Sequence, residues 1–203
     1  MNRLILISVL AIFTLTNCSE SDSSKEKDFT AKIKVSAEKR SEYIKRGGQI
    51  VDASYKALSD KLKSAVADKG ISHALKTCNM HASLIADSLA EQYDATIKRT
   101  AIRIRNQGNE PTTEEKHIIK LYQKALTNKQ ELTPVVLFMD SVYVNYYSPI
   151  IIKPMCLNCH GDPGSTLADE TYETILSMYP TDRAIGYKEG DLRGIWSVKF
   201  KAK

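Results

Sequence analysis

The 203-residue chain is predicted to fold as an α+β domain in which helices precede an antiparallel sheet. The first half carries apolar residues at helical spacing within charged sequence, which is the pattern of amphipathic helices. Residues 133–152 are rich in Val, Ile, Tyr and Phe, which favours strands. The connections between the expected strands are short, and runs of helices followed by runs of strands indicate an α+β fold.

Two long helices are expected first. One runs from 32 to 67, and the Arg-Gly-Gly sequence at 46–48 is a candidate interruption. Lys69-Gly70 is a stop and a turn, because glycine commonly ends helices. A second helix then runs from about 71 to 92.

The sequence 95–106 alternates polar and apolar residues around Ile102 and Ile104, which predicts a half-exposed strand. A loop separates it from a third helix that ends near 127. Thr112 or Thr113 can cap this helix, supported by Glu115 near its start.

The remaining elements follow from composition. Two or three strands are expected within 133–152, and a short helix at 169–178. A loop at 179–191 leads to a last strand at 192–200.

Residues 1–17 are expected to be a signal peptide outside the folded domain. An apolar run at 4–15 is shorter than the roughly 20 residues of a membrane-spanning helix. Cys18 follows at once, as in a bacterial lipobox, where the cysteine receives the lipid. We therefore expect residues 18–31 to be a polar tether and 32–203 the domain. The alternative is an ordinary secretory signal. In both cases the protein is exported, and with the lipid it is anchored to a membrane in the periplasm or at the cell surface.

Composition is that of a globular protein, with 42% hydrophobic and 26% charged residues. The net charge of +5 is mild and spread along the chain, so no nucleic-acid partner is expected.

The motif Cys-x-x-Cys-His at 156–160 carries the chemistry. In an exported protein this spacing is typical of c-type haem attachment. Cys156 and Cys159 would each form a thioether with a haem vinyl group, and His160 would be the axial ligand beneath the iron. One covalently attached haem c is therefore expected.

Three other interpretations compete for these residues. A thioredoxin-like pair needs a strand-to-helix junction in a βαβ unit, which the sequence does not provide. A zinc site would need a fourth ligand, for which Cys78 or His81 is available. A disulfide between Cys156 and Cys159 would be strained.

The second helix offers ligands for the opposite side of the iron. With ~100° per residue, Cys78 lies at the centre of its apolar stripe, and His81 lies about 60° away at the edge. Met80 and His73 fall on the opposite face. Geometry leaves Cys78 open between a ligand and a small buried hydrophobe, with His81 as second choice.

Four segments taken in order resemble a known family, the c-type haem-binding PAS-like domains, long catalogued as a domain of unknown function. Its members include a cyanobacterial photosystem-associated haem protein and sensor modules of bacterial signalling proteins. The segments are 75–90, 98–115, "YYSPIIIKPMCLNCHG" (146–161) and "YPTDRAIGYKEGDLRGIWSV" (179–198), and the last two are the most specific.

The resemblance implies a PAS-like fold with the haem between a central antiparallel sheet and its flanking helices. It also implies that Cys78 is an axial ligand across from His160. Arg99 and Arg105 match basic residues of the family, where pairing with haem propionates and a solvated strand face are equally reasonable.

Thiolate and imidazole together would fill both axial positions, which disfavours substrate chemistry at the iron. We therefore expect electron transfer or redox sensing with a separate redox or signalling partner, and no enzyme activity. The alternative is a sensor of NO or CO that displaces Cys78. Peroxidase-like turnover is disfavoured, because no distal His and Arg pair is evident.

Overall fold

The computed structural model describes residues 36–138 and 142–202, and within helix 37–93 it describes residues 77–83 by their backbone alone. The expected signal peptide, the lipidation site Cys18, the whole of the expected tether and residues 32–35 of the expected domain lie outside the described residues. Within the described parts, no helix combines the length and the apolar character needed to cross a membrane.

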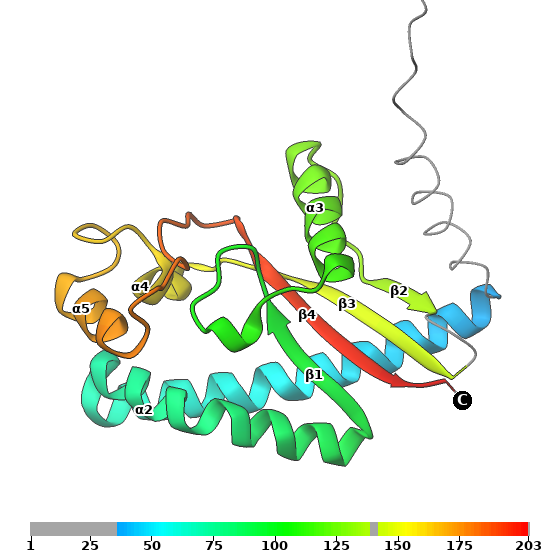
Figure 1. The fold of residues 1–203 in the computed structure, drawn as a ribbon, viewed down its shortest axis with the longest axis horizontal. Helices are drawn as coiled ribbons and strands as arrows, with labels where there is room; N and C mark the ends of the chain where they lie inside the picture. The colour runs from blue at the N-terminus through cyan, green and yellow to red at the C-terminus, as the bar shows by residue number, and fades with distance from the viewer. Residues whose placement is uncertain (1–35, 139–141, 203) are drawn as a thin grey trace, which may run out of the picture. The chain divides into compact units, whose positions relative to one another are not determined.

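The long helix α2 (Ala37–Tyr93) contains a kink that divides it into two arms. Lys69 and Gly70 are non-helical there, and Gly70 has a φ of 79°, which favours glycine. Figure 1 shows the helix turning back on itself at this point. The two predicted helices and the stop between them are therefore confirmed.

Within the described residues, four strands form one sheet in the order β1-β4-β3-β2, and all neighbours are antiparallel. Their bounds are Ala95–Thr100 (β1), Val135–Phe138 (β2), Tyr143–Ile151 (β3) and Leu192–Lys201 (β4). The α+β class, the antiparallel sheet and the long N-terminal helix are thus confirmed.

The first arm of α2 packs on one face of the sheet and forms the main core there. Tyr43 and Ile50 of the helix are buried against Trp196, Val198 and Phe200, which alternate along β4. Each fully buried apolar side chain of this kind stabilises the fold by about 1.5–3 kcal/mol.

Gly47 lets this arm approach the sheet closely. A Cβ atom there would overlap the ring of Tyr146 on β3. The Arg-Gly-Gly sequence at 46–48 therefore marks a packing contact, and the helix runs through it without interruption.

The helix α3 (Thr113–Thr127) also packs on the sheet. Thr112 is its N-cap: the Thr112 side chain accepts from the Glu115 N–H, and the Glu115 carboxylate accepts from the Thr112 N–H. The Tyr122 hydroxyl donates to the carbonyl of Tyr147 on β3, which ties the helix to the strand.

The prediction of a strand over 95–106 is wrong for its second half. β1 ends at Thr100, which pairs with Ile195, and beyond this pair β4 has a bulge near its start. Residues 101–106 therefore have no regular partner strand. They run beside the 179–191 loop instead, where the Ile104 carbonyl accepts from the Arg183 N–H at 3.0 Å.

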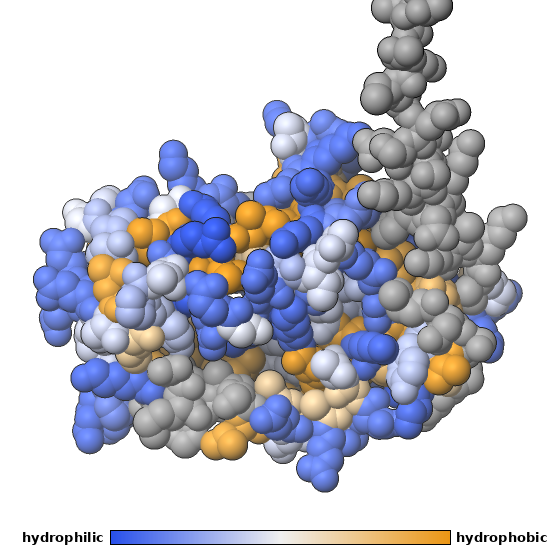
Figure 2. Space-filling view, in the orientation of Figure 1, coloured by the Kyte–Doolittle hydropathy of each residue, from blue (hydrophilic) through white to orange (hydrophobic). Residues whose placement is uncertain are grey.

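Short helical elements gather near the kink of α2 (Figure 1). They are η2 (Pro154–Cys156), α4 (Leu157–His160) and α5 (Asp169–Met178), while η1 (Gln107–Asn109) follows the 101–106 segment. Figure 2 shows a largely hydrophilic face on which hydrophobic residues gather over the region between α4 and the start of β4. The Cys-x-x-Cys-His motif lies at this end of the sheet.

Candidate functional site

The two adjoining short elements η2 and α4 present the motif. Cys156 ends η2, and Cys159 and His160 end α4, so the two thiols lie three positions apart on adjoining turns. The Cys156 sulfur accepts from the Lys153 N–H at 3.4 Å. Both cysteines are partly exposed, and neither takes part in a disulfide.

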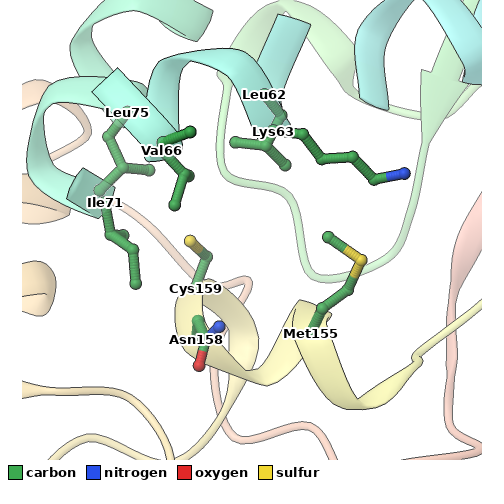
Figure 3. A pocket seen from close by; sticks show the side chains of 9 residues that line it. Leu62, Lys63, Val66, Ile71, Leu75, Met155, Asn158 and Cys159 are labelled. Atoms are coloured by element: carbon green, nitrogen blue, oxygen red, sulfur yellow. The ribbon is translucent and has the colours of Figure 1, made fainter. Parts of the chain in front are cut away.

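An apolar cavity of about 250 Å³ lies between this turn and the kink of α2. Figure 3 shows the Cys159 thiol pointing toward the helix across this space, and the Met155 side chain pointing toward the same helix at the other end of the cavity. The helix lines the cavity with side chains of both arms, among them Leu62, Val66, Ala67, Ile71 and Leu75. The kink thus places an apolar wall opposite the thiol.

The imidazole of His160 is held in one tautomer. Its Nδ1 lies 2.6 Å from the carbonyl oxygen of Ala184. A carbonyl oxygen only accepts, so Nδ1 carries the hydrogen and Nε2 keeps its lone pair. A hydrogen bond from the other ring nitrogen to a carbonyl oxygen is how proteins orient histidine ligands of metals.

Burial lowers the pKa of His160 well below its ordinary value of 6.5, and the nearby guanidinium groups of Arg193 and Arg105 lower it further. The imidazole is therefore neutral at pH 7. A neutral imidazole nitrogen is the form that binds a metal.

Residues 182–187 run alongside the motif and hold it through backbone hydrogen bonds. The Tyr187 N–H donates to the His160 carbonyl and the Gly186 N–H to the Gly161 carbonyl, both at 2.9 Å. Gly161 itself is required by space, because a Cβ there would overlap Thr166 and approach the Leu157 carbonyl.

Arg105 connects three parts of the site. It donates to the Cys159 carbonyl at 2.6 Å and forms an ion pair with Asp182 at 3.1 Å. The Asp182 side chain is fully buried, and its other oxygen accepts from the Ala184 N–H at 2.8 Å. The same aspartate therefore anchors Ala184, the residue whose carbonyl group contacts His160.

The structure places the two basic candidates differently. The Arg105 side chain is only 13% exposed and lies against the backbone of the motif, so it is no part of a solvated strand face. Arg99 is exposed on β1, with its guanidinium 5.5 Å from the centre of the Trp196 ring.

The sequence alone did not identify the residues of the 182–187 loop, or of the bulge near the start of β4, as contacts of the site. The rings of Tyr187 and His160 meet edge to face, with their centres 6.2 Å apart. The guanidinium of Arg103 stacks over the Tyr187 ring, 3.7 Å from its centre. Arg193 lies 5.5 Å from the same ring. The segment 179–198 did carry a signal, as one of the stretches that resembled the haem-binding family.

Cys78, the expected axial ligand, and His81, the alternative ligand, lie in the second arm of α2, but their side chains fall outside the described residues. The expected Cys78 ligand therefore stays a prediction. Among the side chains that the structure does describe, no three His, Cys, Asp or Glu groups come together as a metal site.

Comparison with known proteins decides the family. The model of the Tll0287-like family (Tll0287) matches residues 24–201. The chain belongs to the Tll0287-like family. The match includes the whole Cys-x-x-Cys-His motif and the helix that carries Cys78, so the family resemblance expected from the sequence is confirmed.

A solved structure of this family shares the fold. The crystal structure of the cyanobacterial haem protein Tll0287 matches with a TM-score of 0.54 and 20% sequence identity. The alignment covers 83% of this chain and 98% of that chain. No curated protein matches the chain.

Proposed function

We propose that this Tll0287-like protein carries one haem c and acts in electron transfer or redox sensing. It would do so as an exported, lipid-anchored protein that passes electrons or a signal to a partner, and not as an enzyme. The observation that carries the proposal is the state of His160. Its Nδ1 is engaged by Ala184, its Nε2 lone pair remains available, and it directly follows the second of two cysteines.

The residues around the motif fit a covalently attached haem. The two thiols would form the thioethers, and the Cys159 thiol faces an apolar space bounded by side chains of α2. Haem supplies one-electron redox chemistry when it is bound. The relative of known structure is described as a haem protein, which agrees with this reading.

Charge around the motif also fits. Three guanidinium groups, those of Arg193, Arg105 and Arg99, lie near enough to His160 to lower its pKa. Haem propionates are carboxylates, and guanidinium groups are their usual protein partners. A positive environment therefore suits this cofactor at this place.

Cys78 is proposed as the ligand opposite His160. A thiolate there would stabilise ferric iron and lower the reduction potential, and it would leave no open position on the iron. This arrangement favours exchange of electrons over binding of a substrate.

The test uses the full chain produced with a cytochrome c maturation system. We expect a pigment that resists acid acetone, and optical and EPR spectra of low-spin iron with thiolate ligation. Cys78→Ala should lose the thiolate signature, whereas Met80→Ala, on the opposite face of the predicted helix, should keep it. His81→Ala tests the second choice in the same way.

Two results would contradict the proposal. Colourless protein, or pigment that acid acetone removes, would exclude covalent haem. A reduced protein that is five-coordinate, high-spin and binds CO at once would exclude the second ligand and favour a gas sensor.

A further inference from the structure

Arg193 is the extra residue of a β-bulge. Gly194 pairs with Ile150 and Leu192 pairs with Ile151, so Arg193 has no partner across the strand. A bulge of this kind redirects a side chain, and bulges are common beside functional sites. Here it lies where β4 begins, next to the 182–187 loop that holds His160.

The guanidinium of Arg193 is incompletely satisfied. One terminal nitrogen donates to the Arg103 carbonyl at 3.1 Å, but the Nε atom is buried without a hydrogen-bond partner in the part of the chain that the structure describes. A buried donor without a partner is costly, and more so on a charged group.

The nearby carboxylate does not fill this need. Asp182 directs one oxygen to Arg105 and the other to the Ala184 N–H. Burial lowers the pKa of Arg193, and the positive charges of Arg105 and Arg99 lower it further, whereas Tyr187 and Asp182 raise it. An added anion would offset the crowding of positive charges.

The other arginines of the site have their partners. Arg103 donates to the carbonyls of Ile185 and Gly186 at 2.9 and 3.5 Å. Arg105 has donors directed at Asp182 and at the carbonyls of Cys159 and Ala184. Arg193 is therefore the guanidinium of this group with a buried donor still available.

We propose that Arg193 binds a propionate carboxylate of the haem, with its Nε as donor. This inference rests on the proposed function, and it assigns the contact to a residue other than Arg99 and Arg105. A charge-assisted bond from guanidinium to carboxylate is among the stronger hydrogen bonds in proteins.

The experiment compares matured wild-type protein with Arg193→Gln and with the control Arg103→Gln, which removes a stacked guanidinium from the same Tyr187 ring. Resonance Raman bands of propionate bending report hydrogen bonding to the carboxylate directly. We expect them to shift in Arg193→Gln and to stay unchanged in Arg103→Gln.

The reduction potential provides a second readout. Without the guanidinium, the propionate charge is uncompensated and stabilises ferric iron, so Arg193→Gln should have a lower potential at pH 7. The pKa of this propionate should also rise, so the potential should depend on pH more strongly in Arg193→Gln than in the wild type. Arg193→Lys keeps the charge without the planar fork and should shift the Raman bands with less change in potential.

The inference is overturned if haem is attached but Arg193→Gln and Arg103→Gln have the same bands and potentials. It is also overturned if the wild-type bands and potential change when chloride is replaced by phosphate, because a free anion would then occupy the site. Absence of haem from the wild type would instead contradict the proposed function, so the two failures are distinguishable.

Discussion

The guanidinium of Arg105 donates to the carbonyl oxygen of Cys159, 54 residues farther along the chain, at 2.6 Å. The same group forms an ion pair with the buried carboxylate of Asp182. The turn that carries the two cysteines is thus held by a residue of the 101–106 segment, which follows β1. Arg105 can reach this turn because that segment has left the sheet.

Arg105→Gln should destabilise the protein strongly. It leaves the fully buried Asp182 carboxylate without its cation, and breaking a buried pair in this way costs about 3–5 kcal/mol. Urea unfolding of the full chain without haem measures the change in the free energy of unfolding. Lys56→Gln is the control, because the Lys56–Asp60 pair is exposed, with side chains 78% and 54% accessible, and its loss should have little effect. Equal losses in the two variants would contradict the role of Arg105.

His160 should make the stability of the haem-free chain depend on pH. Its pKa is lowered in the folded state relative to about 6.5 in the unfolded state, so the unfolded state binds more protons between these two values. The contribution of His160 is fully present above about pH 6.5 and is lost as the pH falls below it.

Urea midpoints at about pH 7.5 and 5.5 test this expectation. His160→Gln should reduce the loss of stability at the lower pH, since glutamine can still donate to the Ala184 carbonyl and does not titrate. The same pH dependence in wild type and in His160→Gln would refute the assignment.

Two adjacent glycines of α2 should respond to alanine in opposite ways. Gly47→Ala places a Cβ in the Tyr146 ring and should destabilise by about 1–3 kcal/mol. Gly48→Ala meets only the Tyr146 hydroxyl at 3.9 Å, an ordinary contact, and should stabilise the helix by about 0.5–1 kcal/mol. Thermal unfolding of the two variants gives the signs, and the same sign for both would show that the helix does not approach the sheet as described.

The cap of α3 offers a test with neighbouring threonines. Thr112→Ala removes the side-chain oxygen that accepts from the Glu115 N–H and should cost about 1 kcal/mol. Thr113→Ala, one position into the helix, should stay within about 0.5 kcal/mol of wild type. Denaturant unfolding compares the two variants, and a larger loss of stability in Thr113→Ala than in Thr112→Ala would mean that Thr113 is the cap.

Much of the fold was predictable because its signals are local. The stop at Lys69-Gly70 follows from the positive φ that glycine tolerates, and the short helix expected at 169–178 has these same bounds in the structure. The choice of Thr112 over Thr113 as the cap required the structure. The Arg-Gly-Gly stretch was also ambiguous from sequence. Only the position of Tyr146 on β3 shows that Gly47 lacks a Cβ so that the helix can pack closely on the sheet.

The end of β1 at Thr100 shows a limit of pattern reading. Alternation continues through Ile104, but a strand also needs a partner, and the bulge at Arg193 removes it. The side chains of Arg103 and Arg105 consequently reach the 182–187 loop and the motif.

The sequence by itself determined the motif, because Cys156, Cys159 and His160 fall within five positions and need only one helical turn to come together. Only the tertiary structure decided which imidazole nitrogen is available, since the Ala184 carbonyl lies 24 residues away. It likewise decided that Arg193 has a buried donor without a partner among the described residues. Spacing within one turn is set by covalent geometry, whereas hydrogen bonds between distant segments depend on where the sheet and its bulge place them.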